Sequence, residues 1–190
     1  FMDYYSYSYA AVGNRKGMDS DLYANFKEDD IRKNQFNSIL MPTGKFYYKG
    51  AEANGFRPFS GPQSNIDSDS HYMRVAEMYL LHAEAAAENG NDAAARTSLK
   101  AVLDLRIGDS SYVDALSGSA LAEEAALQAR LELFAEGQSY FIMKRRRETR
   151  TRGANWLDNA GESFSHTDER LTYEIPQEEI LFNPNLSEQN

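Results

Sequence analysis

Five aromatic side chains in loop-like parts of the sequence are the residues best suited to bind a ligand. A sugar ring offers flat C–H faces with polar rims, and a tyrosine ring offers an apolar plate with a hydroxyl handle. Two such plates that cover about 150 Å² in total contribute roughly 4 kcal/mol, which is near millimolar affinity before binding costs are subtracted. The pattern therefore favours weak, multivalent capture. The candidate ligand-binding residues are Tyr47, Tyr48, Phe56, Phe59 and Trp156.

Trp156 is the only tryptophan of the chain and lies in the stretch "GANWLDNAGESF". An indole ring in such a loop either plugs the core or presents a face to a ligand. The sequence leaves both interpretations open.

A metal site is not predicted. The stretch "DSDSH" (Asp67 to His71) supplies oxygen ligands, but an EF-hand loop beginning at Asp67 needs Gly at its sixth place and Glu at its twelfth. Tyr72 and Met78 stand at these places, so a helix N-cap explains the acidic residues better. The histidines, His71, His82 and His166, lack the H-E-x-x-H spacing of a zinc site.

The sequence also offers no catalytic constellation. The chain has no Cys, and no G-x-S-x-G, P-loop or G-x-G-x-x-G motif occurs in it. Asp29 and Asp30 could supply half of a glycosidase carboxylate pair, but adjacent residues in one motif do not flank a bond. We expect a protein that is not an enzyme and that needs no cofactor.

The stretch "KRRRETRTR" (Lys144 to Arg152) holds six of the 20 basic residues, a density that could bind nucleic acid phosphates. The net charge of −9 argues against that role, and consecutive helical residues point about 100° apart, so they form no flat basic face. We therefore predict intramolecular ion pairs and contacts with a helix C-terminus, and no nucleic acid partner. Scaffold roles are likewise expected for Arg130, Glu132, Glu136 and Arg145.

The elements that would position these residues are mainly helical. Asp69 or Ser70 can cap a helix that closes at Gly90, and Asp92 can cap a second one. Because few residues join them, the two helices must fold back as an antiparallel hairpin. The predicted apolar positions are Met73, Ala76, Leu80, Ala83 and Ala87 in the first helix and Ala95, Leu99, Val102 and Leu103 in the second.

A second hairpin is expected further along the chain. Ser119 can cap a helix that buries Leu127, Leu131 and Phe134. Gly137 interrupts it, and helical character resumes from Ser139 to Arg147. In that last helix Phe141 and Met143 are the expected buried anchors.

The predicted fold class is mainly α, with TPR-like helical hairpins and long loop-rich segments. The first hairpin has nearly the length of a tetratricopeptide repeat, although the diagnostic Trp, Gly and Pro positions of that repeat are absent. We expect one domain over residues 1–190, with a loop-rich segment at 1–69, helical hairpins at 70–152 and a loop-rich tail at 153–190. No apolar run approaches the length of a membrane span, and any signal or anchor is expected upstream of Phe1.

Three ordered motifs resemble the C-terminal part of SusD/RagB proteins. They are "MRVAEMYLLHAEAAAENG" from Met73, "RLELFAEGQSYFIMKRRR" from Arg130 and "YEIPQEEILFNPNLSEQN" from Tyr173. Ala129 and Ile142 depart from the family pattern, which has Glu and Asp at these places. Residues 1–72 fit more loosely, through Glu28 to Arg32 and Gly44 to Gly50. The matching residues are Arg74, Glu77, Tyr79, Leu80, Glu84, Arg130, Glu132, Leu133, Glu136, Gly137, Phe141, Lys144, Arg145, Ile175, Pro176, Glu179, Ile180, Asn183, Pro184 and Asn190.

The resemblance implies a surface-exposed lipoprotein of the outer membrane in Bacteroidetes. Such a protein binds a nutrient, typically an oligosaccharide or other glycan, without catalysis and hands it to a TonB-dependent SusC-like porin. Membrane association would then depend only on a lipid anchor upstream of this chain. The alternative from another class is a TPR-like helical module that binds protein, and a glycoside hydrolase is a more distant third.

Overall fold

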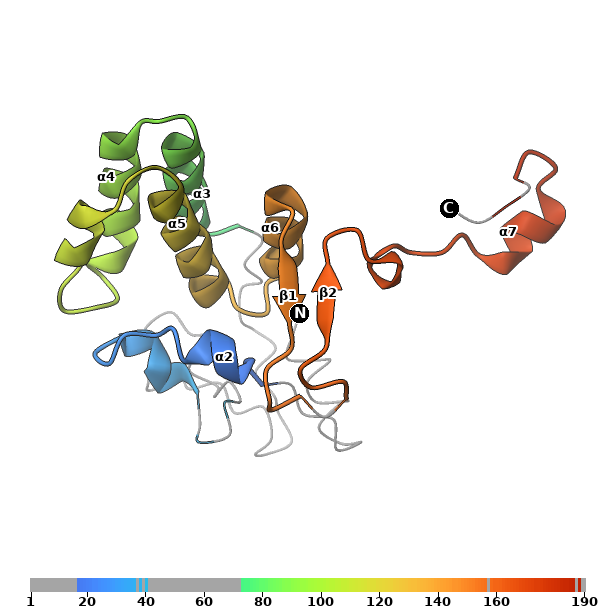
Figure 1. Ribbon diagram of the computed structural model, residues 1–190, viewed down its shortest axis with the longest axis horizontal. Helices are drawn as coiled ribbons and strands as arrows, with labels where there is room; N and C mark the ends of the chain where they lie inside the picture. Colours follow the sequence, from blue (N-terminus) through green and yellow to red (C-terminus); the bar gives the residue numbers. More distant parts are fainter. Residues whose placement is uncertain are drawn as a thin grey trace, which may run out of the picture.

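The computed structural model describes residues 17–36, 38, 40, 73–156, 158–186 and 188. Within these residues the chain is mainly helical, as the sequence predicts. Figure 1 shows α3, α4 and α5 gathered in one bundle, α6 beside a small β hairpin, and the C-terminal segment extending away from this body. The helices are α2 (Ser20–Tyr23), α3 (Val75–Glu88), α4 (Asp92–Leu103), α5 (Gly118–Glu132), α6 (Gln138–Arg146) and α7 (Gln177–Phe182), with 3₁₀ turns η1 (Ile31–Gln35), η4 (Ser111–Ala115) and η5 (Glu169–Leu171).

The first predicted hairpin is confirmed as α3 and α4, but Met73, predicted to be one of its apolar positions, lies before α3 and is mostly exposed. Leu80 and Leu99 are almost completely buried between the helices, and Gly90 adopts a φ of 75° in the connecting turn. The predicted caps are wrong. Arg74 occupies the N-cap position of α3, so this helix does not begin at Asp69 or Ser70, which lie outside the described residues. At the start of α4, Asn91 rather than Asp92 caps the helix, and its side chain accepts from the backbone N–H of Ala94 at 3.2 Å.

The second hairpin is formed by α5 and α6, which meet at Gly137. This glycine has a φ of 84°, a value that a side chain disfavours, which explains the helix break predicted there. The N-cap of α5 is Ser117 and not Ser119, because the helix already begins at Gly118. Helix α3 contacts both α4 and α5, and its outer face carries the exposed side chains of Val75, Met78, Tyr79 and Leu81.

One predicted anchor of α6 is wrong. Phe141 is 57% exposed, whereas Ile142 and Met143 are buried. Neighbouring positions on a helix differ by about 100° in direction. The orientation of α6 about its axis therefore decides which neighbouring side chain enters the core.

A second hydrophobic cluster joins residues 17–36 to the underside of α5. Aromatic edge contacts hold it together, with ring centroids 5.5 Å apart for Tyr23 and Phe26 and 5.4 Å apart for Phe36 and Phe134. The short helix α2 and the turn η1, which lie in the segment expected to be loop-rich, thus fold onto the bundle. The buried members of this cluster are Met18, Leu22, Phe26, Phe36 and Leu131.

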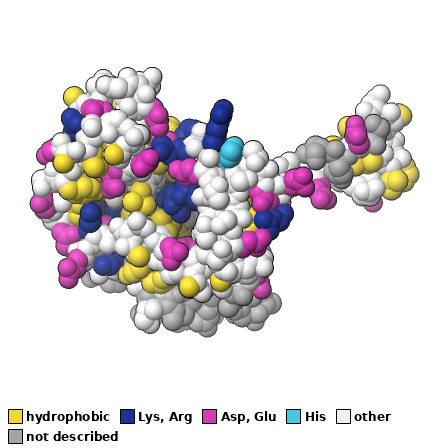
Figure 2. Space-filling view, in the orientation of Figure 1, with side chains coloured by type: hydrophobic (Ala, Val, Ile, Leu, Met, Phe, Trp, Pro, Cys, Tyr) yellow, Lys and Arg dark blue, Asp and Glu magenta, His cyan; other side chains and the backbone are white. Residues whose placement is uncertain are grey.

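The tail is more ordered than the expected loop-rich segment. Strands β1 (Thr149–Thr151) and β2 (Ser163–Ser165) pair antiparallel, with Arg150 opposite Phe164. Beyond η5 the chain extends to α7, which carries exposed Leu181 and Phe182. Figure 2 shows hydrophobic side chains on this distant helix.

Truncating the hairpin core is expected to destabilise the protein strongly. Leu80→Ala or Leu99→Ala should lower the free energy of unfolding by about 2–5 kcal/mol, because each leaves a cavity between α3 and α4. Urea denaturation followed by circular dichroism measures the loss. Leu105→Ala, at a mostly exposed leucine, is the matched control and should change stability by about 0.5 kcal/mol or less. Equal losses at Leu80 and Leu105 would contradict the assigned core.

Candidate functional site

Trp156 is the one sequence-predicted ligand-binding residue that the structure describes. This residue is 45% exposed, so it does not act as a buried core plug. The other four candidates, Tyr47, Tyr48, Phe56 and Phe59, lie outside the described residues. The binding role of all five stays a prediction.

The edge of the Trp156 ring is fixed by a carboxylate far away in the sequence. The indole Nε1–H donates to Oδ2 of Asp19 at 2.6 Å. The backbone N–H of Gly153 donates to the same oxygen at 2.6 Å. Burial alone raises the pKa of Asp19, but the N–H groups of Gly153, Leu22 and Trp156 outweigh it and hold the pKa below its usual range. Asp19 is therefore an ionised acceptor at neutral pH.

The loop that carries Trp156 packs tightly against the segment that carries Asp19. Asn155 makes two bonds to that segment: its Nδ2 donates to the carbonyl of Met18 at 2.8 Å, and its Oδ1 accepts from the N–H of Ser20 at 2.9 Å. A Cβ at Gly153 would lie only 2.7 Å from Oγ of Ser20. Glycine at this position thus lets the two backbones approach.

One face of the Trp156 ring is covered by a cation. The guanidinium of Arg152 lies 4.6 Å from the indole centroid and 4.5 Å from the centroid of Phe164. Arg170 lies over Phe164 in turn, at 4.2 Å, and is held by Asp168 at 2.8 Å and by Glu162. Such alternation of rings and guanidiniums stiffens an exposed surface. We call Trp156, Arg152, Phe164 and Arg170 the stacked ladder.

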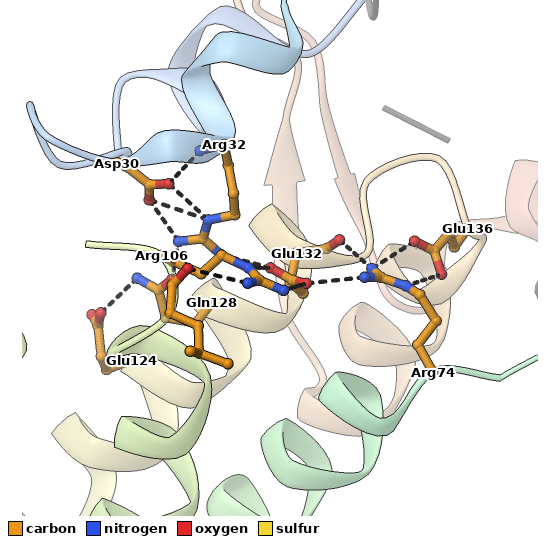
Figure 3. A network of polar contacts seen from close by, with 9 residues as sticks. Asp30, Arg32, Arg74, Arg106, Glu124, Gln128, Glu132 and Glu136 are labelled. Carbon is orange, nitrogen blue, oxygen red and sulfur yellow. Dashed lines mark hydrogen bonds and ion pairs between the residues drawn. The ribbon is translucent and has the colours of Figure 1, made fainter. Parts of the chain in front are cut away.

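A second polar cluster, centred on Glu132, is buried at the C-terminal end of α5. Figure 3 shows the guanidiniums of Arg106 and Arg74 converging on its carboxylate. Arg106 donates to it at 2.9 and 2.8 Å, Arg74 at 2.9 Å and Arg32 at 3.4 Å. Burial raises the pKa of Glu132, but the bonds and charges of these arginines outweigh it and lower the pKa below its usual range.

The partners of Glu132 are themselves paired. Asp30 contacts Arg32 at 2.7 Å, and Glu136 contacts Arg74 at 2.7 Å. Gln128 accepts from Arg32 at 2.6 Å. The carboxylates of this cluster are thus neutralised by arginines. The arrangement is that of a structural network of ion pairs rather than of a catalytic acid–base pair. Asp30, which the sequence raised as half of a carboxylate pair, belongs to it.

The basic stretch of Lys144 to Arg152 makes the predicted intramolecular ion pairs. Arg145 pairs with Glu84 at 2.6 Å, and Arg146 pairs with Glu88 at 3.1 Å and with Glu148 at 2.9 Å. Two of these partners, Glu84 and Glu88, lie on α3 rather than in the tail at 153–190. Figure 2 shows positive and negative side chains intermingled on this face.

Arg130 differs from the other residues for which a scaffold role is expected. Burial and, to a smaller extent, the nearby charge of Arg150 together lower the pKa of Arg130 to about 10. Within the described residues, no hydrogen bond reaches its buried Nε.

Two further functions find no support in the part of the chain that the structure describes. No group of three or more His, Asp or Glu side chains there is placed to hold a metal ion. The helices among those residues are also too short or too polar for any of them to cross a membrane.

Comparison with known proteins identifies the family. A model described as the SusD family matches residues 4–190. The chain belongs to the SusD family. A solved SusD superfamily protein from Bacteroides thetaiotaomicron has a TM-score of 0.69 to this chain at 24% sequence identity, and the match covers 90% of this chain but 40% of that one. This SusD-family chain therefore spans less than half the length of that structure, and no curated protein matches it.

Three of the motif residues that carry the SusD resemblance belong to the scaffold. Arg74, Glu132 and Glu136 join the N-terminal end of α3 to the turn between α5 and α6. The two departures from the family pattern, Ala129 and Ile142, are both buried in the main core. An apolar side chain at these places avoids the cost of burying a charge.

Neutralising the central carboxylate is expected to destabilise this SusD-family chain. Glu132→Gln should lower the free energy of unfolding by about 3–5 kcal/mol, because it leaves the buried guanidiniums without their shared counter-charge. Urea denaturation at pH 7 measures the loss. Glu88→Gln, at an exposed ion pair on α3, is the control and should cost about 1 kcal/mol or less.

The stability difference between wild type and Glu132→Gln is expected to depend on pH. Because the folded-state pKa of Glu132 is lowered, the stability that its charge contributes is fully present above the ordinary glutamate pKa and is lost as pH falls through the lowered value. The stability difference between wild type and Glu132→Gln should therefore shrink on acidification. A difference that stays constant from neutral pH to pH 3 would contradict the assigned role.

Proposed function

We propose that this chain is part of a nutrient-binding protein that captures an oligosaccharide or other glycan at the cell surface without catalysis. The match of residues 4–190 to the SusD family is the observation that carries the proposal. The Trp156 ring supports it, because a fixed aromatic plate with exposed area suits the flat C–H face of a sugar. Such binding is weak at any single ring.

The wider system is part of the proposal. The captured glycan passes to a TonB-dependent, SusC-like porin in the outer membrane, and the parent protein is held at the surface by a lipid anchor. Family membership supports this arrangement. We propose no nucleic acid partner and no cofactor.

A second candidate function is a TPR-like module that binds protein. The outer face of α3 favours it, because exposed apolar side chains follow one another there, whereas most surface helices are polar on that side. An apolar helix face of this kind is typical of helical hairpins that stack on further protein. The exposed residues are Val75, Met78, Tyr79 and Leu81.

Removing the exposed indole is expected to weaken glycan binding. Trp156→Ala should raise the dissociation constant about tenfold or more, since the ring supplies much of the buried apolar area at its site. Isothermal titration with neutral and acidic oligosaccharides at low and high salt measures this. Phe141→Ala, at an exposed ring on α6, is the matched control and should bind like wild type.

The salt series separates a stacking site from an arginine-driven one. A neutral sugar releases few counterions, so its affinity should change little with salt. Strong salt dependence confined to acidic ligands, with no loss in Trp156→Ala, would move the site to Lys144–Arg152. If no glycan binds, and a protein other than the porin binds wild type and Trp156→Ala but not Met78→Lys, the protein-binding candidate holds instead.

The chain is expected to leave its ligand intact. Incubation with polysaccharides and peptides should release no reducing ends and no new amines, because the acidic groups of the Glu132 cluster are held in ion pairs. Chromatography of the products checks this. Turnover that disappears on a single Asp or Glu substitution would overturn the non-catalytic proposal.

A further inference from the structure

We propose that Asp19 is a positioning residue of the Trp156 ring, and that it limits ligand access to the ring face opposite Arg152. This inference rests on the proposed function, in which Trp156 contacts a sugar. No local pattern points to Asp19, because it lies in a different segment from Trp156 and matches no motif.

The bond between the two side chains is suited to fix the ring. A carboxylate that accepts from an indole N–H forms a charge-assisted hydrogen bond, which is shorter and stronger than a neutral one. The 2.6 Å separation between Nε1 and Oδ2 fits this class. With its edge held in this way, the indole cannot turn about its own side-chain torsions without breaking the bond.

Asp19 is in turn held by the backbone. Its Oδ1 accepts from the N–H groups of Asp21 at 2.9 Å and Leu22 at 3.1 Å, so the carboxylate also caps α2. Met18, the preceding residue, is completely buried in the cluster beneath α5. The side chain of Asp19 thus links the Trp156 ring to the core, in addition to the contacts made by the surface loop.

Arg152 decides which face of the ring is available. Its guanidinium lies over the ring of Trp156 and also over the ring of Phe164, so it cannot swing away without losing both contacts. Trp156 is nevertheless 45% exposed, and in this proposal the ligand meets the face opposite Arg152. A sugar would meet a plate that is already immobilised, which removes an ordering cost from binding.

The ring can be observed directly, because Trp156 is the only tryptophan. Time-resolved fluorescence anisotropy reports how fast the indole moves relative to the whole protein. In wild type, the ring should move with the protein. In Asp19→Asn and Asp19→Ala, a fast local decay on the nanosecond timescale should appear. Asp21→Asn is the matched control, since Asp21 lies on the same short helix and makes no side-chain bond to the ring. It should behave as wild type.

Binding provides the second readout, with maltohexaose, cellohexaose and mannohexaose as probes. Asp19→Ala should raise the dissociation constant about three- to tenfold, the range expected when one large side chain must be immobilised on binding. Trp156→Phe keeps a flat ring but loses the N–H donor together with part of the aromatic area of the indole. In that background, Asp19→Ala should weaken binding no further, because the bond between the two side chains is already absent.

The outcomes separate the two proposals. If wild type binds none of the three hexasaccharides while the Asp19 variants still release the ring, the proposed function fails and the positioning role stands. If anisotropy and affinity are both unchanged in Asp19→Asn and Asp19→Ala, the positioning role is overturned even where a glycan binds. Thermal unfolding of each variant checks that the variant is folded. If Asp19→Ala unfolds, Asp19→Asn decides, since unchanged anisotropy and unchanged affinity in that variant also overturn the inference.

Discussion

The buried carboxylate of Glu132 is the group on which the arrangement of the described segments depends. Its oxygens accept from Arg32, Arg74 and Arg106, which come from three segments that are far apart along the chain. An ion taken out of water without partners costs several kcal/mol, and guanidiniums brought together without a counter-charge repel one another. The four side chains are therefore stable only as a set. Assembling the set brings η1, the beginning of α3 and the end of α4 to the C-terminal end of α5.

The same assembly determines where the exposed tryptophan lies. Arg32 fastens residues 17–36 beneath α5, where Leu131 joins the aromatic cluster beside Glu132. Asp19 stands in that segment and reaches Trp156 across the loop that follows β1. A surface ring is thus linked to a buried charge by a short series of contacts. This division is common in binding proteins, in which a rigid scaffold carries a site built on loops.

Local patterns in the sequence were sufficient for the helical hairpins. The period of about 3.6 residues identified Leu80 and Leu99 as core, and Gly90 and Gly137 marked the turns. The exact helix starts were not predictable, because several Ser, Asp and Asn residues near each end could serve as caps. The sequence also did not predict that Ile142 rather than Phe141 is buried. Packing alone determines the rotation of α6 about its axis, and that rotation turns one of these side chains inward and the other outward.

By itself, the sequence determined the family, the helical class and the internal pairing of the basic stretch, because ordered motifs, periodicity and net charge are properties of neighbouring residues. Only the tertiary structure decided the environment of Trp156. A ring in a glycine-containing loop can be plug or plate, and the deciding partner, Asp19, is 137 residues away. No local pattern encodes a contact across such a separation. It arises when folding brings two segments together, and burial and hydrogen bonding then favour one pairing among many.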